Sequence, residues 1–473
     1  MFLQDKLSHH QNAFMALVGV VSALLNALPF LALAHLSEAN DSAAAQNVSA
    51  LIGVSAFFTY ARFRLLVSAR TGLWMLGQGV RRWFNVLFVA LAGLLFLSHG
   101  NLDFQQWRIV LIEWTGLALG LQIGGLAVLR RIAYNINNSS SNKRRAVFFS
   151  LGPKASELAM RLQRSPILGI HVDGYYAPQP LPGQEGSPGG TPRYLGGFAS
   201  AIKQIDSGQI DIAFIPLDKH SYEDEALQLM NRLYDSTTTI YLIPESPIPG
   251  ESVIDNAVIA GVPLLALHET QMVGLSRSFK RATDLVLGSL VLLLVLPVML
   301  LVALAIRLDS PGPIIFRQHR YGERGSSITV FKFRSMRVGS DRLQDGKLRQ
   351  ASANDDRITR VGRILRRTSL DELPQLFNVL GGSMSLVGPR PHAVEHNEMY
   401  RRMIHGYMLR HSVKPGITGW AQIHGLRGET DTPDKMQRRV QYDRYYITNW
   451  SLRLDLKILV RTTVMILWDR NAY

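Results

Sequence analysis

Two adjacent carboxylates, Asp371 and Glu372, are the residues best suited to chemistry. They lie in the run Arg366-Arg367-Thr368-Ser369-Leu370-Asp371-Glu372-Leu373-Pro374. A helix that starts at Asp371 places Pro374 in its first turn, where the missing N–H is not needed, whereas a helix capped by Ser369 would contain the proline. In most Asp-Glu pairs the aspartate is only a helix cap. Here, among cations, an ionised aspartate can attack phosphorus, and the glutamate can hold Mg²⁺ against phosphate oxygens.

Cationic side chains elsewhere are candidates to bind phosphate. Pro389 and Pro391 fix the backbone on either side of Arg390, so its planar guanidinium can bind phosphate with little loss of entropy. Residues 328–336 alternate like a strand, which would place Lys332 and Arg334 on one face. Arg367 is a further candidate. Each pattern alone is more often a rigid turn or a solvated face, and the neighbouring carboxylates favour phosphate binding.

An apolar segment must position these residues at a membrane. Leu285–Ile306 contains 22 residues and no charge, enough to cross a hydrocarbon core. Yet Lys280 and Arg281 precede it and many basic residues follow, and positive charge is retained on the cytoplasmic side. Pro297 near its middle should kink the helix. The sequence therefore predicts a re-entrant helix over 281–306 that enters one leaflet and returns.

Residues 1–134 are predicted to form four transmembrane helices, at 12–34, 49–67, 83–98 and 109–129. Basic residues crowd the second connection and the end of the fourth helix, which places both ends of the bundle in the cytoplasm. A transporter or flippase is an alternative. It is disfavoured because transport paths usually contain intramembrane charges, and these segments offer only Glu113, with Arg62 and Arg64 near one end.

Residues 145–267 are predicted to form a cytoplasmic, Rossmann-like α/β domain. Its expected elements are strands at 146–151, 210–216 and 238–244, helices at 155–164 and 221–234, and a mobile Pro/Gly-rich loop at 178–197. The run Ser150-Leu151-Gly152-Pro153 lacks the glycine spacing of a dinucleotide site, which favours a domain without a cofactor. A non-catalytic scaffold or sensor built on this domain is the second alternative.

The composition limits the classes of molecule that the protein is expected to bind. The net charge is +15, hydrophobic residues make up 47% of the chain, and there is no cysteine, which excludes disulfides, thiolate chemistry and Cys-based zinc sites. No aromatic and basic nucleic-acid motif stands out, so lipid headgroups or phosphate-bearing substrates are favoured over nucleic acid. Residues 400–413 and 452–468 are apolar but interrupted by charges, which predicts amphipathic helices on the membrane or the domain surface.

Several motifs together resemble the bacterial sugar transferases, the monotopic polyprenyl-phosphate hexose-1-phosphate transferases. Besides the run at 366–375, they are Lys280-Arg281 with Asp284, Asp309-Ser310-Pro311-Gly312-Pro313, Phe316-Arg317-Gln318, Lys332-Phe333-Arg334-Ser335-Met336, Gly388-Pro389-Arg390-Pro391 and Lys414-Pro415-Gly416-Ile417-Thr418-Gly419-Trp420. The resemblance covers 275–473. Asp356, Ser383 and Leu296 depart from the usual pattern, but none of them belongs to the dyad.

The resemblance implies a membrane protein of mixed α and α/β class with three parts: the four-helix bundle, the Rossmann-like domain and a monotopic phosphoglycosyl transferase domain at 275–473. A UDP-sugar would bind with Mg²⁺, Asp371 would attack its β-phosphorus with release of UMP, and polyprenyl (undecaprenyl) phosphate would take the sugar phosphate. Glu372 would bind the metal, with Asp371 beside it. Arg390, Arg367, Lys332, Arg334 and Pro389 would contact phosphate or nucleotide.

The same resemblance implies how the product is used and where the enzyme lies. UDP-glucose is the first expectation for the donor and UDP-galactose the second. The lipid-linked product would start an exopolysaccharide, capsule or O-antigen. We expect the protein in the bacterial inner membrane, in contact with membrane lipids, with its catalytic domain on the cytoplasmic face, and a homodimer is plausible.

Overall fold

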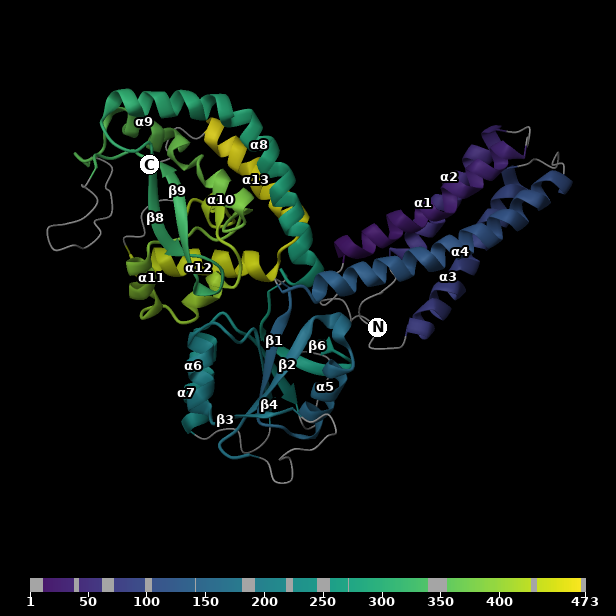
Figure 1. Cartoon of the computed structure of the whole chain (residues 1–473), viewed down its shortest axis with the longest axis horizontal. Helices are drawn as coiled ribbons and strands as arrows, with labels where there is room; N and C mark the ends of the chain where they lie inside the picture. The colour runs from purple at the N-terminus through teal and green to yellow at the C-terminus, as the bar shows by residue number, and fades with distance from the viewer. Residues whose placement is uncertain are drawn as a thin grey trace.

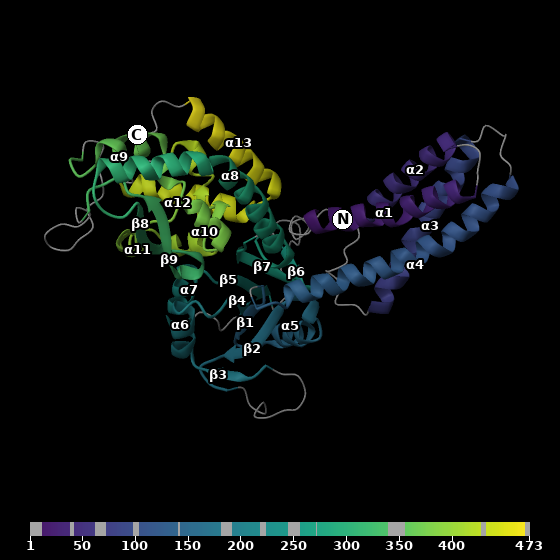
Figure 2. The same cartoon turned by 45° about the horizontal axis from the view of Figure 1, so that its top comes forward.

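Three parts make up the chain in the computed structural model (Figure 1): a bundle of helices, a domain built on a sheet, and a second α/β part that holds the dyad. The structure describes residues 12–37, 42–61, 72–97, 104–140, 142–180, 192–217, 224–244, 256–270, 272–338, 355–426 and 432–468. In both views the bundle extends away from the other two parts (Figures 1 and 2).

The bundle consists of α1 (Asn12–Leu36), α2 (Ser42–Tyr60), α3 (Gly72–Leu97) and α4 (Phe104–Asn137). Three of them contain segments long and apolar enough to cross a membrane: Phe14–Leu36, Leu76–Phe96 and Trp107–Asn137. In the described residues the fourth such helix is α8 (Gly274–Asp309) and not α2, so the four candidate spans are not the four predicted. α2 also lies earlier than the predicted 49–67, whose end falls outside the described residues.

A polar network fills the middle of the bundle. The Asn26 amide donates to Gln122 at 2.8 Å and accepts from the Trp83 indole at 2.9 Å, while Gln122 donates to Ser22 at 2.9 Å. Trp114 donates to the Asn26 carbonyl at 2.8 Å. In lipid a polar side chain needs a partner inside the protein, so these bonds fix which faces of α1, α3 and α4 meet.

The sheet domain has the Rossmann-like order expected from its apolar strands. Its strands, in the order β3-β2-β1-β4-β5-β7-β6, are parallel from β3 to β5, and β7 and β6 pair antiparallel. The elements are β1 (Arg144–Phe149), α5 (Pro153–Gln163), β2 (Ile170–Tyr176), β3 (Tyr194–Gly196), α6 (Phe198–Asp206), β4 (Ile212–Leu217), α7 (Asp224–Tyr234), β5 (Thr239–Pro244), β6 (Asn256–Ile259) and β7 (Val262–His268).

Alternate strand residues enter two separate cores of this domain. Ala146 and Phe148 pack with α5, whereas Val147 and Phe149 pack with α6 and α7. Helices thus cover both faces, as in doubly wound folds. The three predicted strands and two predicted helices are confirmed with small shifts. The loop predicted over 178–197 was partly wrong, because its end forms the edge strand β3, and residues 181–191 lie outside the described residues.

The third part combines short strands with helices. Its elements are α8 (Gly274–Asp309), β8 (Ile315–Tyr321), β9 (Ser327–Phe333), α9 (Arg360–Thr368), α10 (Gln375–Gly381), β10 (Ser385–Val387), α11 (Val394–Arg401), β11 (Gly416–Thr418), α12 (Pro433–Thr448) and α13 (Leu452–Trp468), with 3₁₀ turns η3 (Glu323–Gly325), η4 (Leu370–Glu372), η5 (Tyr407–His411) and η6 (Gln422–His424). The predicted helix at 452–468 is confirmed as α13.

α8 is one continuous helix that contains Pro297 and changes direction along its length (Figure 1). Before the proline, Leu287 and Leu292 pack on the core that includes α10 and α13; after it, Met299, Val302 and Ile306 pack on Phe333 and Leu365. Many other apolar side chains of α8, such as Leu294, are exposed. The helix therefore covers one side of the third part with both of its halves.

Candidate active site

The β8–β9 hairpin presents cations on one face. The strands pair antiparallel with Phe316 opposite Lys332 and Arg320 opposite Ile328, so Arg320 and Lys332 point to the same side. The strand predicted over 328–336 is confirmed as β9, but it ends at Phe333. Arg334 lies just beyond it and follows a different course.

The dyad lies on a short turn between two helices. α9 begins at the Thr359 cap, whose hydroxyl accepts from the Gly362 N–H at 2.9 Å, and Ser369 ends it with a left-handed φ of 58°. Asp371 and Glu372 then occupy the 3₁₀ turn η4. The predicted helix start at Asp371 was wrong. α10 begins at Gln375, directly after Pro374, where the missing proline N–H costs nothing.

Asn378 joins α10 to the β8–β9 hairpin by two hydrogen bonds. Its side-chain oxygen accepts from the Phe331 N–H at 2.9 Å, and its Nδ2 donates to the Thr329 carbonyl at 2.7 Å. The amide thus bonds to β9 as a neighbouring strand would. Ser383 supports the same residue, since its hydroxyl lies 3.2 Å from Asn378 Nδ2. The turn that carries the dyad is therefore tied to the strand that carries Lys332.

A close approach of two glycine backbones shapes the Pro389-Arg390-Pro391 segment. A Cβ on Gly416 would lie 2.0 Å from the Gly388 nitrogen, so only glycine fits there. The Gly388 N–H donates to Thr418 at 2.8 Å, and the Pro389 carbonyl accepts from Gly416 at 3.0 Å. These bonds extend the parallel pair β10–β11 and hold the chain at Arg390.

Glu372 lies at the centre of the site, held by two cations. Arg390 Nη2 and Nη1 donate to its two oxygens at 2.7 and 3.1 Å, and Lys332 Nζ donates to Oε1 at 2.7 Å. Burial raises the pKa of Glu372, but the charges of Arg390 and Lys332 outweigh burial and hold that pKa well below its ordinary value. The structure therefore brings Lys332 and Arg390 together with the dyad, as the sequence suggested.

Asp371 lies in a different environment from its neighbour. It is buried, and in the described part of the chain no hydrogen bond or ion pair engages its carboxylate. Burial raises the pKa of Asp371, and the charge of Glu372 adds to the rise, while Lys332, Arg366 and Arg390 act to lower it. A carboxylate with a raised pKa and no direct partner is a better nucleophile than a paired one.

Two arginines near the dyad differ from the predicted set. Arg367 is exposed on α9, whereas Arg366 acts on Asp371, and its Nη1 is buried without a hydrogen-bond partner among the described residues. Arg320 was missed altogether. Burial and then the charge of Arg390 lower the pKa of Arg320 to about 10, while Glu372 and Asp371 oppose this. The register of β8 with β9, which puts Arg320 on the same side as Lys332, was the one feature that could have indicated its role.

Arg334 contacts the end of α8 and not the dyad. Its Nη2 donates to the Ser310 carbonyl at 2.6 Å and to the Ser310 hydroxyl at 3.0 Å, and its Nη1 donates to the Pro311 carbonyl at 2.9 Å. The last carbonyls of a helix need such donors, and a cation is favoured at that end. A phosphate contact by Arg334 stays a prediction that this arrangement does not favour.

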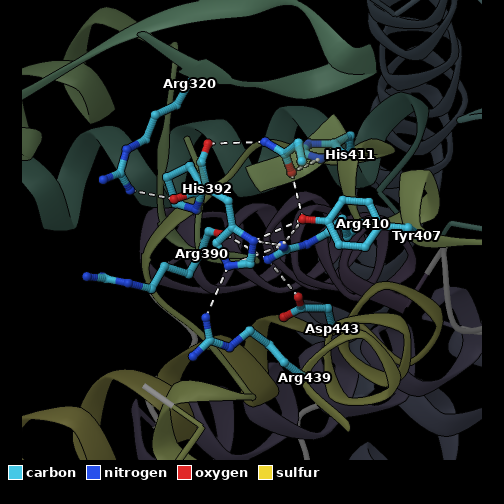
Figure 3. A network of polar contacts seen from close by, with 10 residues as sticks. Arg320, Arg390, His392, Tyr407, Arg410, His411, Arg439 and Asp443 are labelled. Carbon is cyan, nitrogen blue, oxygen red and sulfur yellow. Dashed lines mark hydrogen bonds and ion pairs between the residues drawn. The ribbon is translucent and has the colours of Figure 1, made fainter. Parts of the chain in front are cut away.

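A buried network of polar side chains contacts the backbone carbonyl of Arg390 (Figure 3). Arg410 Nη2 donates to the Arg390 carbonyl at 2.7 Å and lies 2.9 Å from Asp443, and Arg410 Nη1 donates to the Tyr407 hydroxyl at 3.0 Å. His392 lies between Arg410 and Arg439, at 2.6 and 3.1 Å. Burial and then those two arginines hold the pKa of His392 well below its ordinary value, so it is neutral.

The same network corrects one prediction. Residues 400–413 do not form an amphipathic surface helix: α11 ends at Arg401, Gly406 has a φ of 71°, and Arg410 is buried in η5. Arg410, one of the charged residues that suggested a solvated face, instead pairs inside the protein with Asp443 from α12 and donates to the Arg390 carbonyl, whereas Arg402 is exposed.

The dyad fits Mg²⁺ only together with a substrate. Among the described residues no group of three or more His, Asp or Glu side chains could hold a metal ion by itself. Mg²⁺, however, is usually bound by one or two carboxylates and the phosphates of its substrate. Asp371 and Glu372 can supply those carboxylates, and a diphosphate would complete the set.

Comparison with known proteins adds the family. Residues 275–469 match the family described as bacterial sugar transferase. A UDP-glucose:undecaprenyl-phosphate glucose-1-phosphate transferase of Escherichia coli (strain K12) is 41% identical over 377 residues, which cover 79% of this chain and 78% of that protein. The chain belongs to the bacterial sugar transferase family. It is therefore an enzyme, and the resemblance seen in its motifs is confirmed.

Two more relatives of this sugar transferase have the same name. The protein of Klebsiella pneumoniae is 44% identical over 348 residues, covering 73% of this chain and 70% of its own. That of Xanthomonas campestris pv. campestris is 38% identical over 412 residues, covering 84% and 83%. Residues 62–244 also match a family described as CoA-binding domain, which spans part of the helical bundle and most of the parallel sheet.

Proposed function

We propose that the protein transfers glucose 1-phosphate from UDP-glucose to undecaprenyl phosphate through a phosphosugar on Asp371. One observation carries the proposal: Asp371 is buried and has no direct partner among the described residues, beside a glutamate that Lys332 and Arg390 hold ionised. The relatives named above act, by their names, on UDP-glucose and undecaprenyl phosphate.

The first step forms the Asp371–phosphorus bond. An oxygen of the ionised carboxylate attacks the β-phosphorus of the UDP-sugar, the bond from that phosphorus to the bridging oxygen breaks, and UMP leaves with the electron pair. Arg390 and Lys332 lie beside the nucleophile, and Arg366 and Arg320 add positive charge. These cations can stabilise the negative charge that develops on the phosphoryl oxygens.

The second step returns Asp371 to its free form. A phosphate oxygen of undecaprenyl phosphate attacks the phosphosugar, the Asp371–phosphorus bond breaks, and the lipid-linked diphosphate sugar departs. Each half-reaction exchanges one phosphorus–oxygen bond for another, so no further reactant is needed. When bound, Mg²⁺ would supply positive charge that neutralises the phosphate oxygens. Glu372 and Asp371 are the residues that would hold it.

The membrane part of the proposal is that α8 is re-entrant. A straight helix of its 36 residues would span about 54 Å. Directly before its apolar stretch Asp284 accepts from the Leu386 N–H at 3.1 Å, and after that stretch Ser310 accepts from Arg334, so both sides of the stretch contact the same domain. This supports a helix that dips into one leaflet at Pro297. We place that domain at the cytoplasmic face of the inner membrane, where UDP-sugars are available.

Release of UMP tests the proposal. Purified protein in nanodiscs receives UDP-glucose, Mg²⁺ and undecaprenyl phosphate, with Asp371→Asn as the variant and Arg367→Gln as a matched surface control. We expect multiple-turnover release that needs lipid and metal, is lost in Asp371→Asn and persists in Arg367→Gln. A radiolabelled phosphosugar on wild-type protein without lipid acceptor would identify the intermediate. UMP release by folded Asp371→Asn at the wild-type rate would refute the assignment.

The donor is the part that the site constrains least. If UDP-glucose is inactive, UDP-galactose and N-acetylated UDP-sugars separate a wrong donor from a wrong reaction. Inactivity with every donor from folded protein would refute the transferase assignment and favour a scaffold role. The lipid-linked product would start a surface polysaccharide. A homodimer stays a prediction.

A further inference from the structure

The sheet domain contacts the catalytic domain at the turn of the β8–β9 hairpin and at the end of α11, two elements next to the cations that surround the dyad. α6 and α7 lie next to α11 in both views (Figures 1 and 2). We define the brace surface by the side chains that meet there: Asp211, Tyr234 and Asp235 of the sheet domain, and Arg324, Arg401 and His405 of the catalytic domain.

One contact of the brace surface holds the turn of the β8–β9 hairpin. Arg324 in η3 lies 2.7 Å from the Asp211 carboxylate, whose other oxygen accepts from the Arg145 N–H at 2.8 Å. Asp211 is therefore fixed to β1 at the start of β4. Arg324 has a left-handed φ of 58°, which is unfavourable for a residue with a side chain. The pair offsets that strain and fixes the hairpin turn on the sheet domain.

A second contact holds the end of α11. Arg401 Nε lies 2.9 Å from Asp235, just after α7, and its Nη2 lies 4.0 Å from Asp206 at the end of α6. Carboxylates at helix C-termini are unfavourable because the helix dipole is negative there, and Arg401 neutralises both. Beside this pair the rings of Tyr234 and His405 stack, with centroids 4.4 Å apart.

Both contacts involve elements that position the cations around the dyad. The hairpin whose turn Arg324 holds carries Arg320 and Lys332, and α11 begins three residues after Pro391. Two bonds join these elements: the Tyr321 hydroxyl donates to Glu398 of α11 at 2.8 Å, and Arg320 donates to the Pro391 carbonyl. A displacement of the hairpin or of α11 would therefore move the cations around Glu372.

We propose that the sheet domain positions the cations of the dyad by docking on the catalytic domain through the brace surface, with Arg324 and Arg401 as positioning residues. This inference rests on the proposed function and adds a role for the domain that the chemistry itself does not use. The transfer rate then depends on docking, although none of the six side chains of the brace surface belongs to the dyad or its cations.

The KM for the UDP-sugar reports the position of those cations. Lys332 and Arg390 contact Glu372 and would bind the diphosphate of the donor, so their displacement would raise KM. A variant that only lowered the amount of folded enzyme would lower the apparent kcat and leave KM unchanged.

Charge reversal tests the brace surface. Arg401→Asp and Asp235→Arg each place like charges together, and the double variant restores an opposite pair. Arg402→Asp, on the exposed neighbour of Arg401, is the matched control. UMP release is measured across UDP-sugar concentrations, with thermal unfolding and hydrogen exchange of residues 315–333. We expect each single variant to lower kcat/KM at least about five-fold, the lower end of typical couplings, with a higher KM for the UDP-sugar.

The double variant should recover both properties, and Arg402→Asp should match the wild type. Single variants with wild-type kcat and KM would overturn the inference, as would a double variant that stays as slow as the singles. If a reversal unfolds the protein, Arg324→Gly removes the other ion pair, relieves the positive φ and faces the same criteria. Failure of wild-type turnover with every UDP-sugar refutes the proposed function instead.

Discussion

The two carboxylates of the dyad should respond oppositely when each is replaced by its amide. Glu372 forms contacts of 2.7, 2.7 and 3.1 Å with Lys332 and Arg390, and the three side chains are 8%, 15% and 21% exposed. Glu372→Gln removes the charge that pairs with two largely buried cations, although the amide oxygen can still accept one bond. Removing one partner of a buried pair costs about 3–5 kcal/mol, and we expect about 2–3 kcal/mol here.

Asp371→Asn removes a charge that the fold does not stabilise. Because the pKa of Asp371 is raised in the folded protein, its ionisation opposes folding at neutral pH. We therefore expect the free energy of unfolding to stay within about 0.5 kcal/mol of wild type or to rise. Both variants should lose activity, so an activity assay cannot distinguish the roles of the two residues. The free energy of unfolding can.

Thermal unfolding of the three proteins across pH is the assay. The folded pKa of Glu372 is lowered, so its contribution is present above its unfolded pKa and disappears as the pH falls; the deficit of Glu372→Gln should shrink in acid. For Asp371, whose folded pKa is raised, wild-type stability relative to the amide should fall as pH rises through that pKa. Equal destabilisation of both variants, or none for Glu372→Gln, would refute the reasoning.

Three further outcomes follow from the site. Lys332→Gln should shift the acidic limb of the rate of UMP release to higher pH, because Lys332 lowers the pKa of Asp371; an unmoved limb would contradict this. Arg366→Gln should lower kcat/KM about ten-fold or more, the loss of one charged contact, while Arg367→Gln stays near wild type. Arg334→Met should lower the free energy of unfolding by about 2 kcal/mol in thermal melts, because the Ser310 and Pro311 carbonyls lose their donors.

Much of the site could be predicted because its residues are close in sequence and chemically distinctive. Asp371 and Glu372 are adjacent, and the prolines around Arg390 mark a rigid segment. Lys332 could be placed on a strand from its alternating pattern. What a local pattern cannot supply is the distance between segments. The meeting of Lys332 and Arg390 at Glu372 depends on Asn378 and on the β10–β11 pair.

The errors have local causes. Residues 366 and 367 differ by about 100° around a helix, so which arginine faces Asp371 depends on the phase of α9. Gly362 and Leu365 are its buried residues, and their spacing to Arg366 was the available signal. Arg334 was paired with Lys332 by strand alternation, but the strand ends at Phe333. The buried charge of Arg410 was unreadable because its partners come from other segments.

If α8 is re-entrant as proposed, the contacts on both sides of its apolar stretch fix the height of Asp371 relative to the lipid. Asp284 before that stretch is bonded to β10, and Ser310 after it is bonded to Arg334 beside β9, so the stretch cannot slide relative to Asp371. An enzyme placed in this way would meet a lipid substrate in two dimensions. Turnover of the proposed reaction would then follow the mole fraction of polyprenyl phosphate in the membrane, and adding inert lipid would slow it even when the bulk concentration is unchanged.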